Sequence, residues 1–154
     1  MQSRTFGPRF VGACLVILSL TIHLGARQAA RDLEGRWDGQ SSFTDGKTRV
    51  LGPGEVYLVF SGGNLLGKGV VSVDERQLGY TVDAAASPKQ LTYWDLKRPE
   101  RKFLTIYKVE GDNLVIAVPV GGGRPTEFTD KGHTVVLLTL KRGVLPATSQ
   151  VPAW

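Results

Sequence analysis

His133 is the most obvious acid–base residue in this chain. An unperturbed imidazole has a pKa near neutrality, so His133, three residues after Asp130, could act as a general base. A general base needs a nucleophile, and no Gly-x-Ser-x-Gly segment supplies the sharp turn that presents one. We therefore expect Thr129–His133 to be a polar turn before the last strand, and the sequence leaves a catalytic role for His133 undecided.

Two carboxylate pairs have the residue types that glycoside cleavage uses, namely Glu127 with Asp130 and Asp74 with Glu75. That reaction requires one carboxyl group with a raised pKa in an apolar pocket. Both pairs fall in segments with the composition of loops, so we expect them to be solvated surface groups.

The segment Gly62–Gly69 nearly matches a phosphate-binding loop, but Gly69 stands where that loop needs Ser or Thr after Lys68. The next residues, VVSVDE, favour a strand, so these glycines indicate a hairpin. One Cys and two His are too few for a cysteine- or histidine-based metal site. The sequence thus predicts no catalytic residue, no metal and no cofactor.

Arg124 is the residue best suited to binding chemistry. It follows the three glycines Gly121–Gly123 and precedes Pro125, so flexible backbone gives way to rigid backbone at this point. Its guanidinium could then be held at a rim to meet a carboxylate or a phosphate. The alternative is structural, with Arg124 anchoring its own loop to Asp112 or Glu127.

Aromatic residues could line a cavity beside Arg124, although an apolar pocket and a filled core look alike in a sequence. Seven of them lie in the expected strands: Tyr57, Phe60, Tyr80, Tyr93, Trp94, Phe103 and Tyr107. We select Tyr107, Phe103, Tyr57 and Trp94, together with Arg124, as candidate ligand-binding residues.

The composition is that of a folded domain rich in turns. The chain has 154 residues, of which 42% are hydrophobic and 21% charged, with 19 Gly and 8 Pro, and this excludes disorder and favours β structure. The single Cys also excludes a disulfide framework. The net charge is +5, and the densest basic patch, Lys97–Lys102, also contains an acidic residue, so we expect a solvated loop and no nucleic-acid partner.

The N-terminus has the pattern of an export signal. Arg4 and Arg9 precede an uncharged apolar stretch, Phe10–Ala26, and charge returns at Arg27. We expect residues 1–26 to be a signal peptide, with an uncleaved membrane anchor as the alternative, followed by a linker over residues 27–32. The protein would then be periplasmic, envelope-associated or extracellular, and would meet a membrane only through this segment if it is uncleaved.

Residues 33–142 are expected to form one antiparallel β domain, followed by a loose tail at 143–154. Short apolar runs alternate with turn residues and predict eight strands: Gly35–Ser42, Glu55–Ser61, Leu65–Val73, Gln77–Val82, Gln90–Asp95, Lys102–Val109, Asn113–Val118 and Thr134–Arg142. Gly111-Asp112 suits a two-residue hairpin turn. The face of the expected strand Lys102–Val109 that carries Phe103 and Tyr107 is expected to point inward. Short connections favour an up-and-down barrel over a sandwich.

Several motifs in this domain resemble known families. Gly35-Arg36-Trp37 resembles the start of lipocalin-like barrels, in which an Arg late in the last strand packs on the Trp, and Arg142 is the candidate here. The order of motifs also resembles an uncharacterised small secreted domain abundant in planctomycete bacteria. The matching segments are Leu33-x-Gly35-x-Trp37, Pro88-Lys89, Ile106-Tyr107, Gly111-Asp112-x-Leu114, Arg124-Pro125-x-x-Phe128 and Lys141-Arg142.

That resemblance implies a lipocalin-like barrel and export, and it implies no activity. The chain departs from the family pattern at Thr105, Thr92 and Ala117, where the family has Gly, Asp and Cys. We expect a non-catalytic exported module that binds a small apolar or amphipathic ligand inside the barrel. The alternative is a cell-envelope interaction domain with a filled barrel and a protein partner on the surface from Trp94 to Lys102. A void of about 300 Å³ or more would favour the first.

Overall fold

The computed structural model describes residues 31–144 of the chain. The expected signal or anchor, most of the linker and most of the tail lie outside the described residues. Within them, residues 31–33 are helical and nine strands follow. The strands are β1 (Gly35–Thr44), β2 (Lys47–Val50), β3 (Tyr57–Ser61), β4 (Asn64–Lys68), β5 (Arg76–Asp83), β6 (Gln90–Asp95), β7 (Lys102–Glu110), β8 (Asn113–Pro119) and β9 (Val135–Arg142).

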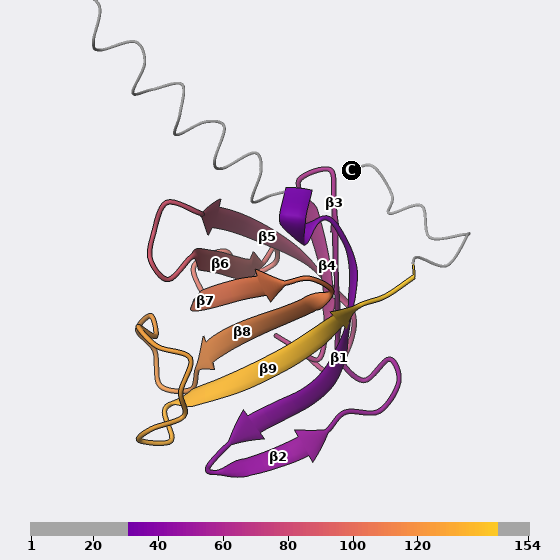
Figure 1. Ribbon diagram of the computed structural model, residues 1–154. Helices are drawn as coiled ribbons and strands as arrows, with labels where there is room; N and C mark the ends of the chain where they lie inside the picture. The colour runs from indigo at the N-terminus through magenta and orange to yellow at the C-terminus, as the bar shows by residue number, and fades with distance from the viewer. Residues whose placement is uncertain (1–30, 145–154) are drawn as a thin grey trace, which may run out of the picture.

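The strands form a closed antiparallel barrel of eight strands with one additional strand, which confirms the expected fold class. Neighbours along the chain pair in sequence from β3 to β9, and β1 pairs with both β3 and β9 to close the ring. Figure 1 shows β1 and β9 side by side, with the β1–β2 hairpin projecting from the ring. This up-and-down order removes the edges of the main sheet, apart from the short strand β2.

The extra strand β2 is a difference from the sequence-based expectation. All four of its residues are exposed, and it pairs only with Ser41–Thr44 at the outer end of β1. A strand without a buried face shows no alternation of apolar and polar residues, so the sequence Lys47–Val50 does not predict a strand. The expected strand Leu65–Val73 is also too long, because β4 ends at Lys68 and Gly69 adopts a positive φ of 75°.

Alternate side chains of each strand point into the barrel and build its core. Tyr107 pairs with Ile116 and Val109 with Leu114, which confirms that the predicted face of β7 points inward. The interior cluster consists of Leu33, Trp37, Leu51, Val56, Leu58, Phe60, Leu65, Leu78, Leu91, Tyr93, Tyr107, Leu114, Ile116, Leu138 and Leu140. These side chains come from every strand of the ring, so their apolar surface is buried only when the barrel is closed.

One end of the barrel, here called the latch end, is closed by Trp37 and Arg142. The Arg142 guanidinium carbon lies 4.2 Å from the centre of the Trp37 ring, which confirms the predicted cation–π contact. Arg142 also donates to the carbonyl oxygens of Glu34 at 2.8 Å and Asp32 at 3.1 Å. The Trp37 indole donates to the Leu33 carbonyl at 2.7 Å. Strands β1 and β9 are thereby tied to the segment that precedes the barrel.

The other motif residues occupy turns and close contacts. Gly35 has a φ of 108°, and a Cβ there would lie 3.5 Å from an Arg142 nitrogen. Gly111, with a φ of 60°, is the first central residue of the β7–β8 turn, and the Asp112 carbonyl accepts a 2.8 Å bond from the Arg142 amide. Pro88 follows a cis peptide bond in the β5–β6 loop. Pro125 lies in the β8–β9 loop, next to Arg124.

The β8–β9 loop folds back over the outer wall of the barrel. Ile106 and Ala117 point outward from β7 and β8 and are buried with Val135, and Phe128 of the loop packs on this second cluster. The loop therefore covers the apolar side chains that β7 and β8 present on this part of the outer wall. Among residues 31–144, no helix has the length and apolar character needed to cross a membrane.

Candidate functional site

Two of the five candidate ligand residues, Phe103 and Tyr107, lie on the inner wall. Tyr107 is fully buried, and its hydroxyl has no hydrogen-bond partner in the part of the chain that the structure describes. Burial, reinforced by the charges of Asp32 and Asp83, raises the pKa of Tyr107 to about 12. Phe103 stacks on Tyr93 with ring centres 5.1 Å apart. Tyr107 is thus core, whereas Phe103 lies closer to the open end of β7.

Tyr57 and Trp94 lie on the outer wall, because their strand neighbours Leu58 and Tyr93 point inward. The Tyr57 hydroxyl bonds to the Glu75 carboxylate, and the Arg36 guanidinium carbon lies 4.3 Å from its ring centre. Partial burial, followed by the bond to Glu75, raises the pKa of Tyr57 to about 12.

Trp94 packs on the backbone of β5. A Cβ on Gly79 would lie within 2.4 Å of the Trp94 ring, and the Lys102 ammonium lies 5.4 Å from the ring centre. Trp94 therefore packs across β5 and β6 on the outer wall of the barrel.

Arg124 also lies on the outer wall, where it anchors the β8–β9 loop. Its guanidinium bonds to the carbonyl oxygen of Thr105 and, at 2.7 Å, to the hydroxyl of Thr92, which points outward from β6. These partners differ from the Asp112 and Glu127 expected for an anchoring role. Burial lowers the pKa of Arg124, and the nearby Asp83 opposes that shift. Arg124 and Tyr107 are consequently on opposite faces of the sheet.

A hollow of about 240 Å³ opens at the end of the barrel opposite the latch, between the β4–β5 and β6–β7 loops. We call it the cationic mouth; its lining residues are Val71, Ser72, Arg76, Asp95, Lys97, Arg98, Arg101 and Phe103. The strand register shows which lining residues project from the inner wall of the barrel. Asp95 pairs with Leu78, Phe103 pairs with Tyr93, and Arg76 precedes Leu78 by two residues, so all three project from the inner wall.

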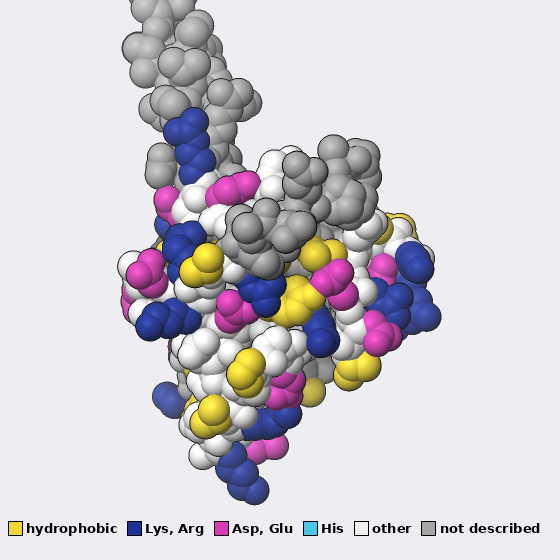
Figure 2. All heavy atoms as spheres, turned by 90° about the vertical axis from the view of Figure 1, so that its right-hand side faces the viewer, with side chains coloured by type: hydrophobic (Ala, Val, Ile, Leu, Met, Phe, Trp, Pro, Cys, Tyr) yellow, Lys and Arg dark blue, Asp and Glu magenta, His cyan; other side chains and the backbone are white. Residues whose placement is uncertain are grey.

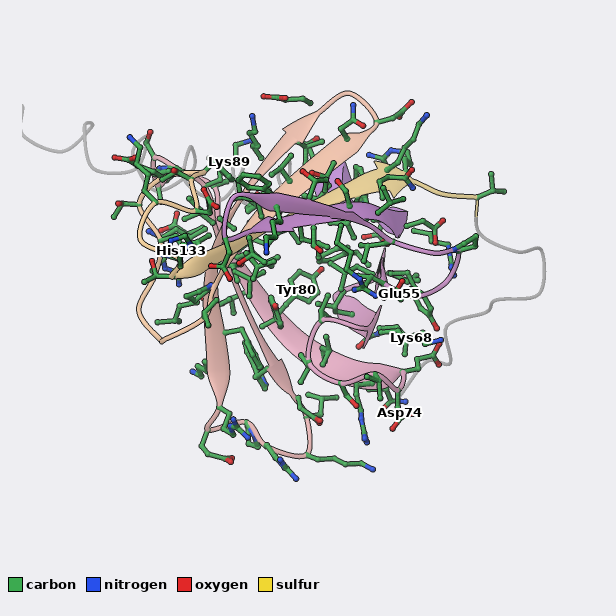
Figure 3. The ribbon with its side chains drawn as sticks, turned by 90° about the horizontal axis from the view of Figure 1, so that it is seen from below. Glu55, Lys68, Asp74, Tyr80, Lys89 and His133 are labelled. Atoms are coloured by element: carbon green, nitrogen blue, oxygen red, sulfur yellow. The ribbon has the colours of Figure 1, made fainter. Side chains whose placement is uncertain are left out.

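Figure 3 looks at the barrel from below. It shows Tyr80 towards the centre of the ring of strands, with Glu55, Lys68 and Asp74 together along one side. The Tyr80 ring meets the Phe60 ring edge to face at 5.2 Å, so the next inward position after Leu78 on β5 is occupied by core. The Phe60–Tyr80 pair thus occupies part of the barrel interior.

The cationic mouth is strongly positive. Its lining has four cationic side chains and one carboxylate, a net of 4 − 1 = +3 charges. In the described part of the chain, Arg76 has one ion pair, with Asp74 at 3.6 Å, and Lys97, Arg98 and Arg101 have none. The Arg76 Nε is buried and has no hydrogen-bond partner there. The Asp95 carboxylate accepts a hydrogen bond of 2.8 Å from the backbone amide of Lys97.

Sequence reasoning missed most of this site. Arg76 lies one residue outside the expected strand Gln77–Val82, and the composition of Lys97–Lys102 predicts only a solvated loop. The signal that could have found Arg76 is its phase, because Arg76, Leu78, Tyr80 and Val82 alternate on one face of β5. The β4–β5 loop, which carries Val71 and Ser72, has no periodic pattern from which its position at the mouth could be predicted.

The remaining acid–base candidates lie in exposed loops. The His133 Nδ1 is 2.7 Å from the Asp45 carboxylate, and the side chains are 68% and 61% exposed. Asp130 accepts from the Gly46 amide at 2.8 Å. Both contacts tie the β1–β2 hairpin to the β8–β9 loop. Among residues 31–144, no group of three or more His, Cys, Asp or Glu side chains is placed to hold a metal ion.

On the face shown in Figure 2, basic and acidic side chains are interspersed, and hydrophobic side chains form only small separate groups. Comparison with known protein families, with curated proteins and with solved structures finds no match for this chain.

Proposed function

We propose that this protein is a non-catalytic binding module that takes a small amphipathic ligand at the cationic mouth. The observation that carries the proposal is a hollow on the inner wall that combines an apolar floor, Phe103 and Val71, with a rim of cationic side chains. Ligand sites in barrels usually lie at a mouth and combine apolar walls with a few polar groups.

The mouth limits the size of the ligand. The fully buried side chains of Trp37, Phe60, Tyr93 and Tyr107 occupy the interior, so the ligand would not reach the centre of the barrel. The expected void of about 300 Å³ or more inside the barrel is therefore absent from the described residues, and the hollow at the mouth, about 240 Å³, is smaller than the range of about 300–1,000 Å³ for drug-sized ligands. A short alkyl chain or a single ring therefore suits it.

Export and a relation to the small secreted planctomycete domains are part of the proposal. Arg4, Arg9 and the apolar stretch Phe10–Ala26 support export. The order of the shared motifs, together with the Trp37–Arg142 contact, supports the relation.

The first experiment titrates the full chain with a fluorescent apolar sulfonate dye while following tryptophan quenching and the thermal midpoint. We expect saturable one-to-one binding that raises the midpoint. The variant Ser72→Phe fills the mouth and should abolish binding, whereas Thr48→Phe on the exposed strand β2 is the matched control and should bind normally. A folded protein that binds no dye would refute the proposal and favour an envelope interaction domain.

A further inference from the structure

We infer that the ligand of the cationic mouth carries an anionic head group, a carboxylate or a similar oxyanion, held by Arg76 and the β6–β7 loop. This inference rests on the proposed function and adds the chemical class of the ligand. Its starting point is the net charge of +3 that lines a small hollow.

Arg76 is the innermost of the cations. It begins β5 on the inward face and is paired with Gly67 of β4. Its side chain is 33% exposed, so the guanidinium lies at the boundary between core and solvent. The Arg76 Nε is buried and has no hydrogen-bond acceptor among the described residues. Burying a guanidinium donor without an acceptor reduces the free energy of unfolding. An oxyanion seated in the mouth would pair with the exposed part of the same guanidinium.

The β6–β7 loop holds the other cations in place through its backbone. The Lys97 amide donates to the Asp95 carboxylate, the Arg98 amide to the Asp95 carbonyl at 2.9 Å, and the Arg101 amide to the Arg98 carbonyl at 3.1 Å. Successive turns of this kind fix the loop without using the cationic side chains themselves. Because Lys97, Arg98 and Arg101 have no ion pair among the described residues, their charges are free to attract an anion.

The apolar part of the mouth fixes the orientation of the ligand. Phe103 stacks on the buried Tyr93, so its ring is a rigid floor, and Val71 faces it from the β4–β5 loop. The apolar body of the ligand would lie on this floor with its head group among the cations. A hollow of about 240 Å³ between two loops suits a free small molecule better than an extended polymer.

The test compares three ligands of equal chain length by calorimetry with the full chain at low salt, each below its micelle concentration: octanoate, octan-1-ol and octyltrimethylammonium. Octanoate should bind about tenfold or more tightly than octan-1-ol, because hydrogen bonds to charged groups contribute more than neutral ones. Octyltrimethylammonium should bind most weakly. Equal affinity for octanoate and octan-1-ol would overturn the inference and leave the proposed function standing. Binding of none of the three would overturn both.

Matched variants assign the effect to the mouth. Arg76→Gln and Arg101→Gln should reduce octanoate affinity to that of octan-1-ol and leave octan-1-ol affinity unchanged. Arg49→Gln, on the exposed strand β2, is the control and should bind octanoate normally. Co-sedimentation with vesicles of anionic phosphatidylglycerol gives a separate outcome. If the chain binds these vesicles but not octanoate, the cations recognise a membrane surface, and the inference of a free anionic ligand is wrong.

Discussion

Tyrosine hydroxyls placed in an apolar interior are the most unusual feature at the scale of single residues. Tyr93 and Tyr107 are both buried, and neither hydroxyl has a hydrogen-bond partner among the described residues. Burial raises the pKa of each of them above the usual value for tyrosine. The rings contribute apolar packing, whereas each unpaired hydroxyl opposes folding because it loses its hydration.

Removal of one hydroxyl tests this balance. Tyr107→Phe should leave stability unchanged or raise it by up to about 1 kcal/mol, while Tyr107→Ala should lose about 3–5 kcal/mol. Urea unfolding of the three proteins measures both changes. A clear loss of stability in Tyr107→Phe would show that the hydroxyl has a partner.

The raised pKa of Tyr107 also predicts a loss of stability in alkali. Its folded pKa is about 12 and the ordinary value is 10, so between these pH values the unfolded chain loses a proton that the folded chain keeps. The stability contribution is therefore fully present below about pH 10 and is lost as the pH rises towards about 12. Thermal midpoints from neutral to alkaline pH should fall less steeply in Tyr107→Phe. Identical slopes in the two proteins would contradict this prediction.

At the scale of elements, the contact between β5 and β6 depends on a glycine. Gly79 pairs with Trp94, and any Cβ at residue 79 would lie within 2.4 Å of the indole ring. Gly79→Ala should therefore displace the ring and cost about 1–3 kcal/mol. Gly121→Ala is the matched control, because no atom of the described residues, apart from Gly121 and its chain neighbours, lies within 4 Å of a Cβ there. Tryptophan emission and urea unfolding measure the two effects, and equal stability of both variants would contradict the contact.

At the scale of the whole molecule, closure of the barrel depends on the latch. Arg142 joins the last strand to carbonyl groups of Glu34 and Asp32, which are 108 and 110 residues away in the sequence. Arg142→Met should lose about 2–4 kcal/mol through the cation–π contact and the two hydrogen bonds. Lys141→Met, at the exposed neighbouring position, should be nearly neutral. Hydrogen exchange should also speed up in β1 of Arg142→Met, and an unchanged rate would mean that the latch is not part of the cooperative unit.

Local sequence patterns were enough to predict the fold class and the inward face of β7. Alternation of apolar residues places Tyr107 inside, and Gly111 permits the backbone angle of its hairpin turn. Both features follow from local periodicity and turn chemistry, which a single chain displays directly. The Trp37–Arg142 contact is instead an expectation from the resemblance of Gly35-Arg36-Trp37 to the start of lipocalin-like barrels, and the structure contains this contact.

The contacts of the candidate side chains, in contrast, depend on how the loops pack in three dimensions. The sequence leaves Arg124 either at a rim or as an anchor of its own loop, and in the structure it anchors the loop on the outer wall through Thr92 and Thr105. Arg76 and Arg101, distant in the sequence, line one hollow because the β4–β5 and β6–β7 loops emerge at the same end of the barrel. The path of a loop follows from long-range packing and hydrogen bonds rather than from the periodicity of its own residues, so a site built from loops emerges only once the barrel is closed.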